Sequence, residues 1–285
     1  MKCKLSTLWN WIHNQLWISN PRKESYYILK NFFSLSEKDF IIDTQVEVSL
    51  KKLKTLKDII RRRNLHEPFA YIFQKKEFFS LNFKVTPDVL IPRPETEELV
   101  ELALKEINKI SFEHLLGMDI GTGSGCIAIS LLKNCPKIQT IYAIDREPKT
   151  LVIARENAIL LLKEKANQIR FLVWDILQKN LLFENFFHFL IANPPYILVH
   201  EHEKLQKEIF FEPYEALVVE KPTYFFYRFF KNAFLLLKSN GYFFLESSPS
   251  LIPLQKKILK RIGFSTVFVY KDYNHLERFL VTRKP

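Results

Sequence analysis

The chain has 285 residues, 47% of them hydrophobic and 26% charged, which excludes a mainly disordered protein and allows one large domain or two smaller ones. Lysine and arginine number 42 against 31 acidic residues, and the net charge of +11 favours polyanionic or acidic partners over neutral small-molecule substrates. The three cysteines lack disulfide or zinc spacing, and no apolar run is long enough to span a membrane. We therefore expect a cytoplasmic protein with no metal and no membrane partner.

Residues 1–66 show the periodicity of a small helical bundle. Apolar residues recur at steps of three and four in stretches that begin near residues 5, 22 and 46, and Ser36 is placed to cap a further helix. The last stretch ends in three consecutive arginines, Arg61 to Arg63. We interpret this run as a solvated helix C-terminus, where positive charge favours the helix dipole, in preference to a nucleic-acid patch. The sequence thus predicts an N-terminal helical domain over residues 1–66.

The pattern changes after residue 66. Aromatic and β-branched runs at 69–73 and 78–85 predict a strand pair, so we expect a β-hairpin linker over residues 67–92. In residues 93–285 strands and helices alternate, which is typical of an α/β, Rossmann-like fold whose mainly parallel sheet has helices on both faces. The predicted helices are 96–109, 125–133, 149–163, 223–238 and 250–261, and the seven predicted strands are 115–120, 139–145, 169–174, 187–192, 241–246, 265–271 and 278–283.

Glycine is scarce, with 6 in the whole chain, yet three stand in the run Gly121-Thr122-Gly123-Ser124-Gly125 between a predicted strand and a predicted helix. Glycines there let backbone N–H groups approach a ligand beside a helix N-terminus. The spacing is neither the dinucleotide fingerprint nor a P-loop. The next two predicted strands end at Asp145 and Asp175-Ile176, where a carboxylate could accept ribose hydroxyls and a base could pack. A tight turn and two helix caps are the structural alternative.

A second motif, Asn193-Pro194-Pro195-Tyr196, follows the apolar strand that is predicted to end at residue 192. The nitrogen of a planar NH2 group is a poor nucleophile because its lone pair is delocalised. The Asn193 oxygen and the Pro194 carbonyl could accept its two protons and aim the lone pair at a methyl donor, while Tyr196 could pack on the planar group. The prolines stiffen the turn. The structural alternative is a rigid turn with an Asx cap.

Together the two motifs resemble those of class I S-adenosylmethionine-dependent methyltransferases that act on planar nitrogen in adenine, cytosine or glutamine. The resemblance implies S-adenosyl-L-methionine as the cofactor. It also implies that Asn193, Pro194, Pro195 and Tyr196 are catalytic and bind the substrate. The residues expected to bind the cofactor are Gly121, Thr122, Gly123, Ser124, Gly125, Asp145, Asp175, Ile176 and Asn193.

The surrounding segments resemble the protein-(glutamine-N5) methyltransferases that modify peptide chain release factors. The similarity covers nearly the whole chain and is most specific in the run Leu90-Ile91-Pro92-Arg93-Pro94-Glu95-Thr96-Glu97, with further matches at 67–72 and 211–217. From the residues alone, Thr96 is also a candidate helix N-cap. Three positions where the family usually has glycine hold other residues, namely Gln74, Ser80 and His275.

This family resemblance implies a seven-stranded methyltransferase sheet over residues 93–285 and a monomeric enzyme. It would methylate the glutamine of the Gly-Gly-Gln motif in class I release factors, and the helical domain of residues 1–66 would recognise that substrate. The alternative is an adenine N6-methyltransferase acting on DNA or RNA, which keeps both motifs. We disfavour a nucleic-acid partner because the chain has no recognisable nucleic-acid-reading module. A protein that binds cofactor without turnover is a third possibility, and the intact Asn193 to Tyr196 motif speaks against it.

Overall fold

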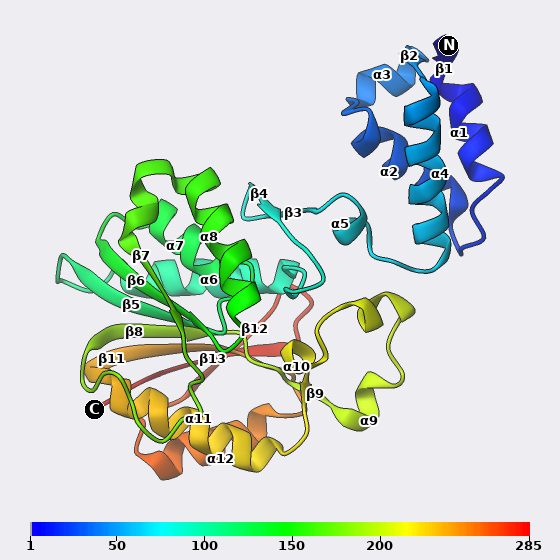
Figure 1. Ribbon diagram of the computed structural model, residues 1–285. Coiled ribbons are helices and arrows are strands. Elements are labelled where there is room, and N and C mark those ends of the chain that lie inside the picture. The colour runs from blue at the N-terminus through cyan, green and yellow to red at the C-terminus, as the bar shows by residue number, and fades with distance from the viewer. Residues whose placement is uncertain (1) are drawn as a thin grey trace. The chain divides into compact units, whose positions relative to one another are not determined.

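The computed structural model describes residues 2–285, and these divide into two compact units (Figure 1). One unit comprises the chain up to Gln74 together with the later segment Gln206–Phe211, and the other comprises Lys75–Leu205 and Glu212–Pro285. The first unit thus contains a short piece of chain that lies far from it in the sequence. Within residues 2–285, no helix is long and apolar enough to cross a membrane.

The larger unit is built on the predicted seven-stranded sheet, in the order β12-β13-β11-β8-β5-β6-β7. The five strands from β11 to β7 run parallel, and β13 pairs antiparallel with both β11 and β12. Their bounds are β5 Leu115–Ile120, β6 Ile138–Asp145, β7 Ile169–Val173, β8 Phe187–Ala192, β11 Leu237–Glu246, β12 Phe268–Lys271 and β13 Glu277–Arg283. The parallel order brings the ends of β5, β6 and β8, and hence both sequence motifs, to one edge of the sheet.

Helices cover both faces of this sheet. Figure 1 shows α6, α7 and α8 on one face and α11 and α12 on the other. Each face has its own apolar core, as a buried parallel sheet requires. The helices span α6 Pro94–Ile107, α7 Cys126–Asn134, α8 Pro148–Leu162, α11 Pro222–Leu236 and α12 Ile252–Ile262.

The hairpin β3 (Lys75–Phe78) and β4 (Leu81–Lys84) belongs to this larger unit. Asn157 on α8 binds both backbone polar groups of Lys84 and also donates to the Ser124 carbonyl in the glycine-rich loop. The hairpin is thereby joined to the loop that begins α7. Short elements complete the unit, namely η1 Lys163–Gln168, β9 Ile197–Leu198, α9 Val199–His202, α10 Tyr214–Leu217 and β10 Val218–Val219.

The smaller unit is the predicted helical bundle with its own apolar core. Ser36 and Asp39 form a capping box at the start of the third helix, as the position of Ser36 suggests. Its elements are β1 Lys2–Lys4, α1 Leu5–His13, α2 Pro21–Phe32, α3 Glu37–Ile41, β2 Gln45–Glu47, α4 Leu50–Asn64, α5 Phe69–Ile72 and the later η2 Lys207–Phe211.

Three local predictions are wrong. Residues Phe69–Ile72 form the short helix α5 instead of a strand, because the preference of aromatic residues for strands is weak and tertiary packing can override it. Val46 lies in β2, and the fourth helix begins only at Leu50, after the N-cap Ser49. The arginine run is not wholly solvated, since Arg63 is buried and pairs with Glu24 and Glu208.

Candidate active site

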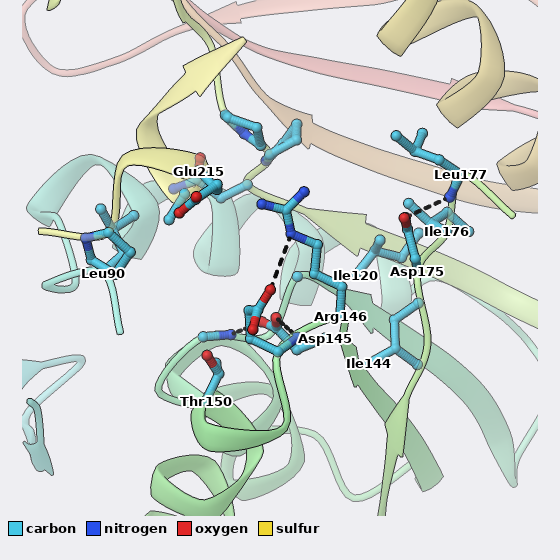
Figure 2. Close-up of a pocket in the computed structure, with 18 of the residues that line it drawn as sticks. Leu90, Ile120, Ile144, Asp145, Arg146, Thr150, Asp175, Ile176, Leu177 and Glu215 are labelled. Carbon is cyan, nitrogen blue, oxygen red and sulfur yellow. Dashed lines mark hydrogen bonds and ion pairs between the residues drawn. The ribbon is translucent and has the colours of Figure 1, made fainter. Parts of the chain in front are cut away.

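A pocket in the larger unit lies where both sequence motifs meet, at the carboxyl ends of β5, β6 and β8. Figure 2 shows Leu90 and Glu215 toward one side of it and Asp175, Ile176 and Leu177 toward the other. The floor and walls also carry apolar side chains that could sandwich a planar base. These are Ile120, Ile144, Trp174, Phe225 and Phe229.

The glycine-rich loop has the geometry of a ligand cradle. Gly121, Gly123 and Gly125 have φ angles of +72°, +56° and +81°, which side chains rarely adopt. A Cβ atom added at Gly121 would meet no atom within 4 Å, so open space lies beside this backbone. Gly121 and Gly123 line the pocket, whereas Gly125 caps the start of α7.

Asp145 connects this loop to the end of β6. Its carboxylate accepts the N–H of Gly123 and the N–H of Glu147, both at 3.1 Å. Burial raises the pKa of Asp145 above its usual value. Asp145 lies at a strand end beside open backbone, and burial leaves its carboxylate with little contact to water. Ribose hydroxyl groups suit this position because they would donate further hydrogen bonds to it.

Two predicted loop residues lie beneath the pocket and do not line it. Thr122 and Ser124 are buried, and the Thr122 hydroxyl donates to Asp119 at 2.6 Å. Asp119 also accepts the N–H of Ala128 in the first turn of α7. Burial raises its pKa to about 7. Thr122 and Asp119 therefore connect the loop to the first turn of α7.

The charge of the pocket is opposite to that of the chain. Five carboxylate residues line it, and Arg146 is the one basic side chain among the described lining residues. A ligand that carries positive charge fits such a lining, whereas a polyphosphate does not. The cationic S-adenosylmethionine matches this charge, the base-sized apolar walls and the open glycine backbone. The five carboxylates are Asp88, Asp145, Glu147, Asp175 and Glu215.

The Asn193 motif joins the pocket to a buried network. The Nδ2 of Asn193 donates to Thr96 Oγ1 at 3.0 Å, and the Thr96 hydroxyl donates to Glu246 Oε2 at 2.8 Å. The Tyr196 hydroxyl donates to the other oxygen, Glu246 Oε1, at 3.1 Å. Glu246 is fully buried at the end of β11, and burial raises its pKa to about 7. Asn193, Pro194 and Pro195 line the pocket, but Tyr196 does not.

Thr96 is not the helix cap that its position suggested. Helix α6 begins at Pro94 with Arg93 as its N-cap, so Thr96 lies within the first turn and its hydroxyl is free to reach Glu246. Glu246 is 150 residues away in the sequence, and neither residue stands in a motif that indicates the partner. The sequence therefore gave no signal for this pair.

A second link holds two segments of the pocket wall together. Glu212 is buried, accepts the N–H of Ile91 at 3.0 Å and forms an ion pair with Arg93. The chain on either side supplies Leu90 and Pro213 to the pocket. The run at 90–97 and the run at 211–217 are thus neighbours in space, and Glu212 connects them. Sequence reasoning named both segments without finding this contact.

No cluster of metal-ligating side chains occurs within residues 2–285. All residues that line the pocket belong to the larger unit. Of the predicted site residues, the structure brings Gly121, Gly123, Asp145, Asp175, Ile176 and the first three residues of the Asn193 motif into one pocket.

The chain matches two family models and many whole proteins. Residues 100–263 match the methyltransferase small domain, and residues 11–73 match the PrmC N-terminal domain. The release factor glutamine methyltransferase of Buchnera aphidicola subsp. Schizaphis graminum is 34% identical over 93% of this chain and 93% of its own length. Those of Flavobacterium psychrophilum and Thermodesulfovibrio yellowstonii are 35% and 37% identical, over 90% and 84% of this chain and 89% and 84% of their own lengths. Since both of its domains and nearly its whole length match, the chain belongs to the release factor glutamine methyltransferase family, whose methyl donor is S-adenosyl-L-methionine.

Proposed function

We propose that this enzyme transfers a methyl group from S-adenosyl-L-methionine to the side-chain amide N5 of the glutamine in the Gly-Gly-Gln motif of class I release factors. The observation that carries the proposal is the position of Asn193. It lines an acidic pocket with its amide nitrogen already bound to Thr96, so its oxygen is available for a donor in the pocket. The relatives that match over the full chain are named for this reaction.

The chemistry requires two hydrogen-bond acceptors placed against an NH2 group. The Asn193 oxygen and the Pro194 carbonyl would accept the two amide protons of the substrate glutamine, which draws electron density back to its nitrogen and fixes its direction of attack. When bound, S-adenosylmethionine supplies an electrophilic methyl group on its sulfonium. The nitrogen forms one bond to carbon, the sulfur–carbon bond breaks, and the surplus proton leaves the nitrogen for water.

The cofactor-binding roles rest on the lining of the pocket. Gly121 and Gly123 would approach the cofactor with their backbone, and Asp145 would accept its ribose hydroxyls. Asp175 and Ile176 would hold the adenine, with Thr122, Ser124 and Gly125 keeping the loop in shape from below. Tyr196, which Glu246 holds, would pack against the glutamine amide once the substrate enters.

The smaller unit would recognise the folded release factor. Helix α4 presents a row of exposed lysines, Lys51, Lys54 and Lys57, which gives this unit a basic face for an acidic surface of the substrate. Because one chain supplies the whole pocket, we infer that the enzyme works as a monomer. Release factors act on ribosomes, so enzyme and substrate would meet in the cytoplasm.

The test is incubation of the purified enzyme with labelled S-adenosylmethionine and a class I release factor, with duplex and single-stranded nucleic acid in parallel reactions. Mass mapping should find one methyl group on the Gly-Gly-Gln glutamine. Label in adenine alone would refute the proposal and support an adenine N6-methyltransferase. Label in neither substrate, with cofactor bound, would mean that the pocket binds without turnover.

A further inference from the structure

The Thr96 hydroxyl lies between Asn193, which lines the pocket, and Glu246, which is fully buried behind it. Thr96 is itself buried, with 2% of its surface exposed. It comes from the first turn of α6, while Glu246 ends β11 and Asn193 follows β8. Three distant segments therefore meet in one hydrogen-bonded chain at the site.

A hydroxyl carries only one proton, which fixes the direction of this chain. Both oxygens of Glu246 accept a hydroxyl proton, one from Thr96 and one from Tyr196. Thr96 therefore uses its one proton in the hydrogen bond to Glu246, so its oxygen can only accept a hydrogen bond from Asn193. The Asn193 amide must then turn its NH2 toward Thr96, which leaves its oxygen on the opposite side.

We propose that Thr96 and Glu246 are positioning residues for methyl transfer: they hold the Asn193 side chain with its oxygen, and not its NH2 group, toward the substrate nitrogen. This inference rests on the proposed function. The reversed amide would set one NH2 group against another, so that the substrate NH2 group would keep only the Pro194 carbonyl as an acceptor. Two amide orientations of equal shape thus differ completely in what they offer to the glutamine.

The charge on Glu246 decides which orientation is favoured. A protonated Glu246 would donate a hydrogen bond to one of its two hydroxyl neighbours. If it donated to Thr96, the Thr96 hydroxyl could in turn donate to the Asn193 oxygen, which would favour the reversed amide. The charged groups that act on Glu246 are Arg278 on β13, which favours ionisation, and Glu95 on α6, which opposes it; burial is the largest influence and raises its pKa. Turnover should therefore increase with pH as Glu246 loses its proton.

The experiment compares Thr96→Val, which removes the hydroxyl at nearly constant shape, with Thr96→Ser, which keeps it. Turnover of a class I release factor, KM for that factor and Kd for S-adenosylmethionine are measured for each. We expect Thr96→Val to lower kcat by at least about 30-fold and to leave Kd and KM within about threefold of wild type. The increase of kcat with pH near neutrality should be absent in this variant. Thr96→Ser should keep at least about a third of wild-type kcat.

Thr282→Val is the matched control, because Thr282 is a buried threonine on β13 whose hydroxyl contacts only the Ser265 and Thr266 carbonyls among the bonds described. Rates are expressed per molecule of enzyme that binds cofactor, and Thr96→Ala replaces Thr96→Val if the valine variant fails to fold. A Thr96→Val enzyme with kcat within twofold of wild type, or a serine variant as slow as the valine variant, would overturn the inference. A wild-type enzyme inactive on the release factor would instead refute the proposed function.

Discussion

Among the described residues, eleven that are not glycine have a positive φ angle, which suits glycine, and three of these bear on the family resemblance. Gln74, Ser80 and His275 have φ angles of 51°, 58° and 63°. The family resemblance implies glycine at these three positions, and the residues present here have the left-handed backbone that glycine would adopt. The departures therefore place strain in the backbone without changing the fold.

His275→Gly should stabilise the protein. His275 is exposed in the turn between β12 and β13, where its N–H donates to the Asp272 carbonyl, and glycine would keep this bond while relieving the strained φ. Glycine also increases the conformational entropy of the unfolded chain, which offsets part of this gain. We expect a net increase of about 0.5–1 kcal/mol in the free energy of unfolding. Urea denaturation measures it, with His275→Ala as control because alanine keeps the strain. An equal effect of both substitutions would contradict this explanation.

Asn193→Ala should separate catalysis from cofactor binding. Loss of the side-chain oxygen removes one of two acceptors for the substrate amide, and we expect kcat to fall by about 10²–10³-fold. The Kd for S-adenosylmethionine, measured by calorimetry, should stay within about threefold because the glycine loop and Asp145 are untouched. Asn134→Ala on the exposed end of α7 is the control. Near-normal turnover in Asn193→Ala would refute the assigned role.

At the scale of elements, periodicity located the strands and helices of the larger unit to within a few residues, because each buried face repeats on a local scale. Periodicity failed where contacts between residues far apart in the sequence determine the local structure. Phe69–Ile72 form a helix, and Arg63 is buried because Glu24 and Glu208 lie beside it, 39 and 145 residues away in the chain. The two motifs predicted where the pocket lies, but the Thr96–Glu246 and Glu212–Arg93 contacts depend on tertiary structure alone.

The arginine run of α4 allows a comparison between a buried arginine that pairs with distant segments and an exposed one that pairs locally. Arg63 is buried between Glu24 of α2 and Glu208 of η2, whereas Arg61 is exposed and pairs with Asp58 one turn earlier. Arg63→Ala leaves two carboxylates without their partner and should lower the free energy of unfolding of the smaller unit by about 3 kcal/mol. Arg61→Ala should change it by less than about 0.5 kcal/mol. Equal losses in chemical denaturation would contradict the burial argument.

For the molecule as a whole, two buried carboxyl groups link stability to pH. Burial raises the pKa of Glu246 from 4.5, and that of Asp119 from 3.8, to about 7. Their folded-state pKa values exceed the unfolded ones, so the stability they confer is complete in acid and is lost as the pH rises to about 7. The charge that Glu246 needs in order to orient Asn193 therefore destabilises the fold.

Glu246→Gln should reveal this linkage. The free energy of unfolding of wild type should fall between pH 4.5 and pH 8, with a contribution of about 3 kcal/mol from Glu246. The glutamine variant lacks that contribution, so its stability relative to wild type should improve as the pH rises. Urea denaturation at pH 5 and pH 8 measures the difference. Parallel stability curves for the two proteins would show that Glu246 keeps an ordinary pKa.

The division into two units predicts that cofactor binding and substrate recognition can be separated. Every residue that lines the pocket belongs to the larger unit, whereas the exposed lysines of α4 belong to the smaller one. A chain that begins at Lys75 should bind S-adenosylmethionine within about threefold of the full-length Kd. It should lose at least about 100-fold in kcat/KM on an intact release factor, because the substrate contacts that we propose for the smaller unit would be missing.

Two controls identify the cause of that loss. A short Gly-Gly-Gln peptide carries the glutamine without the folded body of the release factor, so the full-length and shortened enzymes should methylate it at equal low rates. The shortened chain also deprives Gln206–Phe211 of the unit in which it packs. A full-length enzyme with Lys51→Glu, Lys54→Glu and Lys57→Glu avoids this disturbance, and its KM for the intact factor should rise while its activity on the peptide is unchanged. Full activity of the shortened chain on the intact factor would instead mean that the larger unit recognises the substrate by itself.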